Sequence, residues 1–176
     1  AGLAERILAA KNPVIVCGDE LVKCDALAKA TEFAETLGAD VFQQTVPYGA
    51  HYLSEHVCFL GTLSRDQKNV RDTLQFYDLM VVLGADVLRM SVWSEVDPMP
   101  VGLPILQIGL VDWEMGKNYP AEQAVYGDLR ETLTAIVPVL REKGGDDLVA
   151  RAAANLEGLK LRNWSAKRSK VVDAIE

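Results

Sequence analysis

The side chains best placed for chemistry are three aspartates, Asp19, Asp86 and Asp112, each of which comes shortly after a predicted strand. Ligands of open α/β sheets bind beyond the carboxyl ends of the strands, so a carboxylate there could act as a general base. Each aspartate could equally cap the helix that follows, and the sequence leaves both interpretations open. His51 and His56 are five residues apart in a predicted loop. This spacing does not indicate a shared metal-binding face of a helix.

The three cysteines, Cys17, Cys24 and Cys58, have no spacing typical of a zinc site. Cys17 lies in an apolar run, where a buried thiol behaves as a small hydrophobic side chain. We interpret all three as structural, and unpaired structural cysteines are typical of a reducing, cytoplasmic setting. No metal site is predicted.

The known phosphate-binding and nucleophile motifs are absent. A dinucleotide loop would show Gly-x-Gly-x-x-Gly after the first strand, whereas this chain reads Cys17-Gly18-Asp19-Glu20. Carboxylates at that helix start would repel a pyrophosphate that the helix dipole otherwise attracts. Neither Gly-x-x-x-x-Gly-Lys-Ser/Thr nor Gly-x-Ser-x-Gly occurs.

The composition indicates one globular domain. The chain has 176 residues, 49% of them hydrophobic, and a formal net charge of −7. This length suffices for one substantial core. The acidic balance argues against a nucleic-acid partner, and no apolar run is long enough for a membrane span.

The hydrophobic pattern alternates between strands and helices. Apolar runs predict strands at 14–17, 39–42, 79–83, 104–108 and 124–126, with a sixth candidate near 57–59. Helical spacing covers 1–12, 21–37, 66–76 and a segment that Asp128 caps and the glycines at 144–145 end. Pro138 is expected to kink that last helix or to lengthen its hydrogen bonds. The order predicts a doubly wound, mainly parallel sheet of five to six strands flanked by helices, a Rossmann-like fold of the NAD/FAD-binding type.

Two regions are expected along the chain. Residues 1–145 form the domain, and 146–176 form a helical linker toward a catalytic domain absent from this chain. Basic residues gather at 160–170 in that second region, which could be a docking arm or a solvated face. The chain starts at Ala1 and stops at Glu176, both within helix-like patterns, so we expect a segment of a longer polypeptide.

Several segments, in order, resemble the central domain of thiamine-diphosphate-dependent enzymes, a family that includes acetolactate synthases and benzoylformate decarboxylase. The resemblance covers residues 1 to about 142. Its segments are Ile7-Leu8-Ala9-Ala10-Lys11-Asn12-Pro13-Val14-Ile15-Val16-Cys17-Gly18, Gly38-Ala39-Asp40-Val41, His56-Val57-Cys58-Phe59-Leu60-Gly61, Asp78-Leu79-Met80-Val81-Val82-Leu83-Gly84-Ala85, Glu114-Met115-Gly116-Lys117-Asn118 and Val125-Tyr126-Gly127-Asp128.

The resemblance implies a central domain that is mostly architectural. In such enzymes two outer domains bind thiamine diphosphate and magnesium and perform the chemistry. The Gly-Asp-Gly motif of the diphosphate site does not occur here. The expected partners are therefore the two catalytic domains of the parent chain, within a homo-oligomer. No catalytic residue is expected, and the chain alone should not turn over a 2-keto acid.

The resemblance also raises the question of FAD, bound by acetolactate synthases, and of ADP, bound by some decarboxylases. Flavin-binding members of the family usually have two acidic residues at the end of the fifth strand, and Gly109 and Val111 stand at those two positions here. Lost cofactor hydrogen bonds cost about 1–3 kcal/mol each, so no tight FAD site is expected. A retained FAD or ADP site would use Gly18, Gly84, Asp112 and Asp128.

Two alternatives stay open. One is a freestanding NAD- or FAD-binding Rossmann-like protein, for which His51 and His56 would be the only histidine candidates. The other is an interaction module that docks a partner through the basic segment at 160–170.

Overall fold

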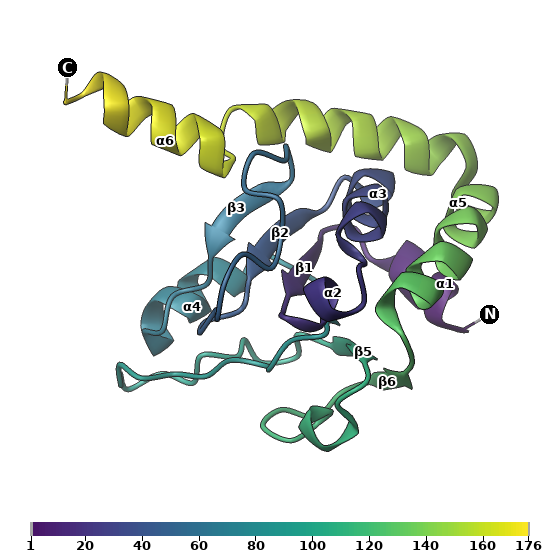
Figure 1. Cartoon of the computed structure of the whole chain (residues 1–176), viewed down its shortest axis with the longest axis horizontal. Helices are drawn as coiled ribbons and strands as arrows, with labels where there is room; N and C mark the ends of the chain where they lie inside the picture. Colours follow the sequence, from purple (N-terminus) through teal and green to yellow (C-terminus); the bar gives the residue numbers. More distant parts are fainter. Residues whose placement is uncertain (1, 176) are drawn as a thin grey trace.

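Six short apolar runs pair into one all-parallel sheet in the computed structural model, which describes residues 2–175 (Figure 1). The strands are β1 (Pro13–Cys17), β2 (Asp40–Gln43), β3 (Phe59–Thr62), β4 (Leu79–Leu83), β5 (Ile105–Gly109) and β6 (Gln123–Tyr126). The helices are α1 (Gly2–Ala9), α2 (Glu20–Lys23), α3 (Leu27–Leu37), α4 (Gln67–Leu74), the 3-10 helix η1 (Asp112–Glu114), α5 (Leu129–Lys160) and α6 (Trp164–Asp173).

The strand order is β3-β2-β1-β4-β5-β6, which confirms the predicted doubly wound fold. The chain winds outward from β1 to β3, then crosses back and winds outward from β4 to β6. The direction therefore reverses between β1 and β4, where Val14 pairs with Met80 and Cys17 with Leu83. In doubly wound sheets, the crevice beyond the carboxyl ends of such strands is the usual ligand site.

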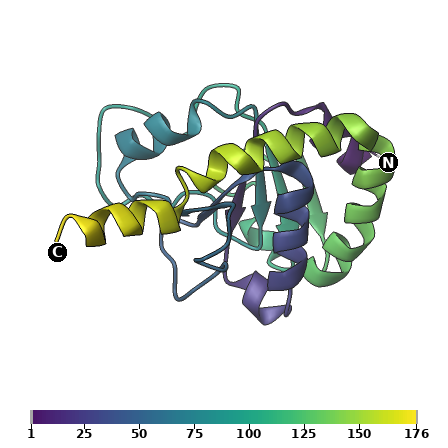
Figure 2. The same cartoon turned by 90° about the horizontal axis from the view of Figure 1, so that it is seen from above.

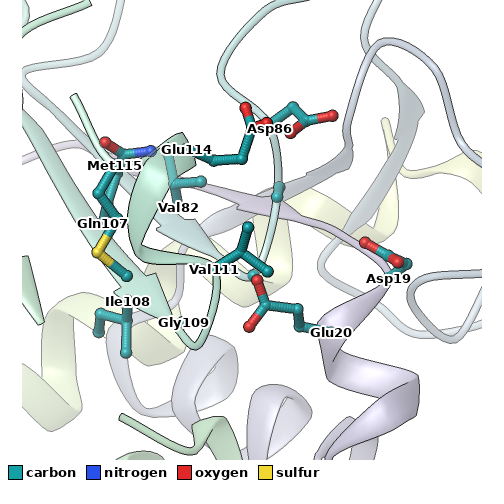
Figure 3. Close-up of a pocket in the computed structure, with 12 residues that line it drawn as sticks. Asp19, Glu20, Val82, Asp86, Gln107, Ile108, Gly109, Val111, Glu114 and Met115 are labelled. Atoms are coloured by element: carbon teal, nitrogen blue, oxygen red, sulfur yellow. The ribbon is translucent and has the colours of Figure 1, made fainter. Parts of the chain in front are cut away.

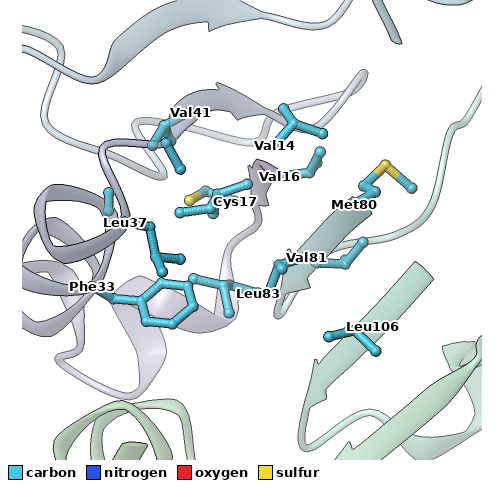
Figure 4. Packing of buried hydrophobic residues seen from close by; sticks show 14 of the residues in the cluster. Val14, Val16, Cys17, Phe33, Leu37, Val41, Met80, Val81, Leu83 and Leu106 are labelled. Carbon is cyan, nitrogen blue, oxygen red and sulfur yellow. The ribbon is translucent and has the colours of Figure 1, made fainter. Parts of the chain in front are cut away.

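The core lies on both sides of the sheet, as the apolar runs predict. Every residue of β1, β4 and β5 is buried, and Figure 4 shows Phe33 and Leu37 of α3 packed beside the strands. Figure 1 places α3 and α5 on one side of the sheet and α4 on the other. The additional strand that was predicted near 57–59 is β3, which runs from Phe59 to Thr62.

The helix predicted at 21–37 is two helices. Asp25 has a positive φ of 48°, and the Asp25 and Ala26 N–H groups donate to the carbonyl oxygens of Val22 and Leu21. This pattern is a Schellman motif, and aspartate is one of the few residues that tolerate the left-handed conformation it needs. The prediction was wrong because the apolar spacing continues across the break.

The segment between β4 and β5 takes the place of a crossover helix. It is irregular, as predicted, yet Val87, Leu88, Met99 and Leu103 are buried in the core. Arg71 of α4 donates to the carbonyl oxygens of Asp97 and Met99 and holds this segment against the sheet.

Pro138 lies inside α5 with helical backbone angles. The predicted end of that helix at residues 144–145 is confirmed, because Gly145 has non-helical angles, φ 52° and ψ −150°, and a second helical segment follows it within α5. Only glycine adopts such a conformation readily. Figure 1 shows the chain turning there, so that the second half of α5 runs across the molecule.

The segment after Gly145 packs onto the domain. Leu148, Ala152 and Leu159 are buried, and Figure 2 shows this half of α5 lying over α3. The Arg162 guanidinium binds both carboxylate oxygens of the buried Asp40, at 2.7 and 2.8 Å. Arg162, although half exposed, is therefore tied to the sheet through Asp40. Whether residues 146–176 lead to a further domain stays a prediction.

Candidate functional site

A small crevice opens where the direction of winding reverses, beyond the carboxyl ends of β1, β4 and β5 (Figure 3). The turn from β1 into α2 forms one wall. The residues after β4 form a second wall, and the third comes from the end of β5 and the segment after it, with Gln107, Ile108, Gly109, Val111, Glu114 and Met115. The free volume of the crevice is about 50 Å³, which is room for a few water molecules and far below the roughly 300–1,000 Å³ of ordinary ligand pockets.

Glu20 lines this crevice from the start of α2. It is the first residue of α2 and only 7% exposed. Its Oε2 accepts a hydrogen bond of 2.6 Å from the Leu110 N–H. Figure 3 shows the side chain reaching from the helix toward Gly109 and Val111. A carboxylate thus ties the end of β1 to the end of β5.

Burial raises the pKa of Glu20 above its ordinary value. The Leu110 N–H and Lys23 act in the opposite direction because they favour the carboxylate, whereas the nearby Asp19 adds to the rise. Desolvation of the charged form is the largest of these effects.

We expect Glu20 to give the chain a pH-dependent stability that the Glu20→Gln variant lacks. An acid with a raised pKa in the folded state favours folding most below its unfolded pKa, and this advantage is lost as pH rises through the folded pKa. The measurement is urea unfolding of both proteins between pH 4 and 7. The free energy of unfolding of the wild type should fall relative to that of Glu20→Gln as pH rises. A difference that is constant, or that grows in favour of the wild type, would contradict the assignment.

Gly18 and Gly84, two of the predicted cofactor-binding residues, lie in direct contact beside this crevice. A Cβ added to Gly18 would lie 2.1 Å from the Gly84 carbonyl oxygen and 2.4 Å from Ala85 Cα. Gly84 has a positive φ of 57°, and a Cβ there would lie 2.3 Å from Glu20 Cβ. The close approach of two backbones accounts for glycine at both positions without a ligand.

Asp112 and Asp128, the other two predicted residues, lie apart from this contact. Asp112 begins η1 and is not among the residues that line the crevice. Asp128 caps α5, as predicted, because its carboxylate accepts the Glu131 N–H at 3.0 Å. That hydrogen bond lowers the pKa of Asp128. The four residues therefore do not form one cluster.

The rim of the crevice is acidic. Asp86 and Glu114 come from different loops and point toward one another in Figure 3. Burial, together with Glu114, raises the pKa of Asp86, while a hydrogen bond from Lys117 lowers the pKa of Glu114. Arg89 pairs with Asp86 at 2.7 Å and donates to the Tyr48 hydroxyl at 2.8 Å. These contacts tie the rim loops together but leave no cation facing the crevice among its lining residues.

The two histidines lie in different surroundings. His56 Nδ1 accepts hydrogen bonds from the Cys58 N–H and the buried Tyr52 hydroxyl, so its proton is assigned to Nε2, which donates to Glu35 at 3.0 Å. These contacts fix the loop before β3. His51 is 2% exposed, and burial lowers its pKa. Its main-chain N–H donates to Gln43 Oε1. Nothing in this arrangement presents a nucleophile to a histidine base.

The cysteines are unpaired, with Cys17 and Cys58 buried. Burial raises the pKa of the Cys17 thiol, and that of Cys58 to about 12. Neither thiol is poised for reaction, because the thiolate is the reactive form. Within residues 2–175, no three His, Cys, Asp or Glu side chains lie close enough together to hold a metal ion. In the same range, no helix is long and apolar enough to cross a membrane.

Sequence reasoning noted Glu20 only as an acid that would repel a phosphate, and it missed Gln107 and Glu114. Gln107 Oε1 accepts the Gly116 N–H at 2.6 Å and shapes the loop after β5. The only signal for Glu20 is its position, because an acid stands where a phosphate-binding loop would have a glycine.

Comparisons with known proteins agree with the fold. Residues 1–136 match the family described as the central domain of thiamine pyrophosphate enzymes. The chain is 29% identical to benzoylformate decarboxylase of Pseudomonas aeruginosa over 141 residues, which are 80% of this chain and 26% of that protein. It is 26% identical to the acetolactate synthase large subunit of Corynebacterium glutamicum over 155 residues, 87% of this chain and 24% of that protein.

A solved structure of a similar protein has the same fold. The thiamine diphosphate-dependent 4-hydroxybenzoylformate decarboxylase of Rhodococcus jostii RHA1 superimposes with a TM-score of 0.72 at 27% identity, over 79% of this chain and 26% of that one. The chain thus spans about a quarter of the length of the proteins that it matches.

Proposed function

Because the chain belongs to the family of thiamine pyrophosphate enzyme central domains, we propose that it is the non-catalytic central domain of a 2-keto acid decarboxylase or carboligase that depends on thiamine diphosphate and magnesium. The observation that carries this proposal is the family match along residues 1–136, which includes the whole sheet. The similarity to benzoylformate decarboxylase and acetolactate synthase supports the parent's reaction class.

An architectural role is supported by how the polar side chains at the crevice are used. Glu20 accepts main-chain N–H groups, Asp86 pairs with Arg89, and Asp19 pairs with Lys23. General acid–base catalysis needs a titratable group within reach of a substrate. Here each of these carboxylates binds the domain's own loops and helices, and the crevice has no room for a 2-keto acid beside them.

The proposed partners are the two catalytic domains of the parent chain, in a cytoplasmic homo-oligomer. Thiamine diphosphate and magnesium would bind to those domains. The segment from residue 146 onward would lead toward one of them: it passes over α3, and its last helix, α6, lies beside β3, where Lys167 donates to the Leu60 carbonyl oxygen, with no buried residue of its own. The freestanding NAD- or FAD-binding protein is the alternative.

The isolated chain is expected to show no turnover. Purified protein is incubated with thiamine diphosphate, Mg²⁺ and either benzoylformate or pyruvate, and release of CO₂ is measured, with a complete benzoylformate decarboxylase as the positive control. The expected rate equals that of a blank without protein. A saturable rate that requires both thiamine diphosphate and Mg²⁺ would overturn the non-catalytic assignment.

A further inference from the structure

We infer that the crevice where the winding reverses carries its own anion: the Glu20 carboxylate takes the main-chain hydrogen bonds that the diphosphate of a nucleotide would take, and the domain therefore binds no nucleoside diphosphate or dinucleotide. This inference does not rest on the proposed function, because it concerns only the contacts of Glu20.

The main-chain N–H groups after β5 form the anion-binding part of the crevice. The Leu110 N–H points at Glu20 Oε2 at 2.6 Å, and the neighbouring Val111 N–H also favours the charged form of the same carboxyl group. A short contact of this kind is typical of a charge-assisted hydrogen bond. Adjacent N–H groups that converge on one acceptor are also how protein loops bind phosphate oxygens. In this chain the acceptor is part of the protein.

The remaining space does not fit a nucleotide. A Cβ on Gly109 would lie 2.9 and 3.0 Å from the two Glu20 carboxylate oxygens, so the carboxylate lies directly against the backbone of β5. The free volume of about 50 Å³ is several times too small for an adenosine diphosphate. A ligand would have to displace Glu20 and leave its charge without a partner in a buried place, which is costly.

The charges that line the crevice also disfavour a nucleotide. Asp19, Asp86 and Glu114 line the crevice together with Glu20, and no lysine or arginine lines it. Three of the four carboxyl groups that a diphosphate would meet have a cation of their own: Asp19 pairs with Lys23, Asp86 with Arg89 and Glu114 with Lys117. Glu20 accepts a main-chain hydrogen bond instead, and a second anion beside it in this partly buried site would be repelled. The hydrogen bond from the Leu110 N–H to the buried carboxylate makes the assignment specific to Glu20.

The first test follows amide hydrogen exchange at Leu110 and Val111 in the wild type, Glu20→Ala and Glu20→Gln. Asp19→Ala is the matched control, because Asp19 lines the same crevice but pairs only with Lys23. Loss of a hydrogen bond to a charged group corresponds to exchange about tenfold faster or more. We expect this faster exchange at Leu110 in Glu20→Ala, and the same or a smaller increase in Glu20→Gln, which keeps a single acceptor. Asp19→Ala should leave both rates unchanged.

Protection of the Val82 amide in β4 shows whether each variant remains folded. If Glu20→Ala loses that protection, the comparison rests on Glu20→Gln, which preserves the shape of the side chain. A Leu110 rate that stays at the wild-type value in folded Glu20→Gln and Glu20→Ala would overturn the inference.

The second test is calorimetric titration of the wild-type chain with ADP and with FAD. We expect no saturable heat up to about 1 mM of either ligand, a concentration typical of weak metabolite binding. Saturable binding of ADP or FAD that Gly109→Ala abolishes would overturn the inference and favour the alternative of a nucleotide-binding protein. It would leave open whether the chain decarboxylates a 2-keto acid, which the CO₂ assay measures separately.

Discussion

Replacement of Arg162 by alanine is expected to lower the free energy of unfolding by about 3 kcal/mol. The Arg162 guanidinium binds both oxygens of Asp40, whose side chain is 6% exposed, and the Tyr77 hydroxyl donates to the same carboxylate. Without Arg162, the Asp40 charge is left buried with only Tyr77. The effect is placed at the lower end of the range for buried pairs because the Arg162 side chain is 53% exposed. The measurement is urea unfolding at neutral pH.

Two variants control this prediction. Arg168 pairs with Glu55 at 3.2 Å, and both side chains are about two-thirds exposed, so Arg168→Ala should have no measurable effect. Adding Asp40→Asn to Arg162→Ala should restore part of the lost stability, because no charge is then buried alone. If Arg162→Ala proved as harmless as Arg168→Ala, residues 146–176 would not be held to the sheet by this pair.

Gly18→Ala is expected to destabilise the chain by about 3 kcal/mol or more, because the added Cβ would overlap the Gly84 carbonyl oxygen at 2.1 Å. The contact joins the two turns that leave β1 and β4, and neither backbone can move without breaking the pairing of those strands. Gly84→Ala should be similarly costly, since Gly84 also has a positive φ. Thermal and urea unfolding of the chain without any ligand measure both effects.

Gly158→Ala is the matched control, with the opposite expected sign. Gly158 lies within α5, and no atom lies within 4 Å of the place where its Cβ would be. Alanine there should stabilise the helix by about 0.5–1 kcal/mol. If Gly18→Ala unfolded like the wild type, close packing would not explain this glycine, and a ligand-binding role would regain support.

The strands and the order of winding could be predicted because they depend on local features. Continuous apolar runs such as Leu79–Leu83 are typical of strands buried on both faces, and Gly38, in the left-handed conformation, ends α3. The glycines at 144–145 likewise mark the break in α5, as predicted. The break at Asp25 was harder to predict, because Asp25 interrupts a stripe whose apolar spacing continues.

The candidate site was predictable only in its location. The crevice lies at the predicted edge of the sheet, but its main occupant is Glu20, whose role depends on Leu110, 90 residues later. The Asp40–Arg162 pair spans 122 residues and joins two polar residues that no periodicity connects. Such contacts follow from the folded arrangement, so hydrophobic pattern and short motifs cannot show them.

The most direct test of the central claim is the mass and thiamine diphosphate content of the native protein that carries this chain. The protein is captured from its source cells with an antibody against this domain, its mass is measured, and bound thiamine diphosphate is released and oxidised to fluorescent thiochrome. We predict a polypeptide several times longer than 176 residues with about one thiamine diphosphate per subunit. A native protein of 19.3 kDa without thiamine diphosphate would contradict the account.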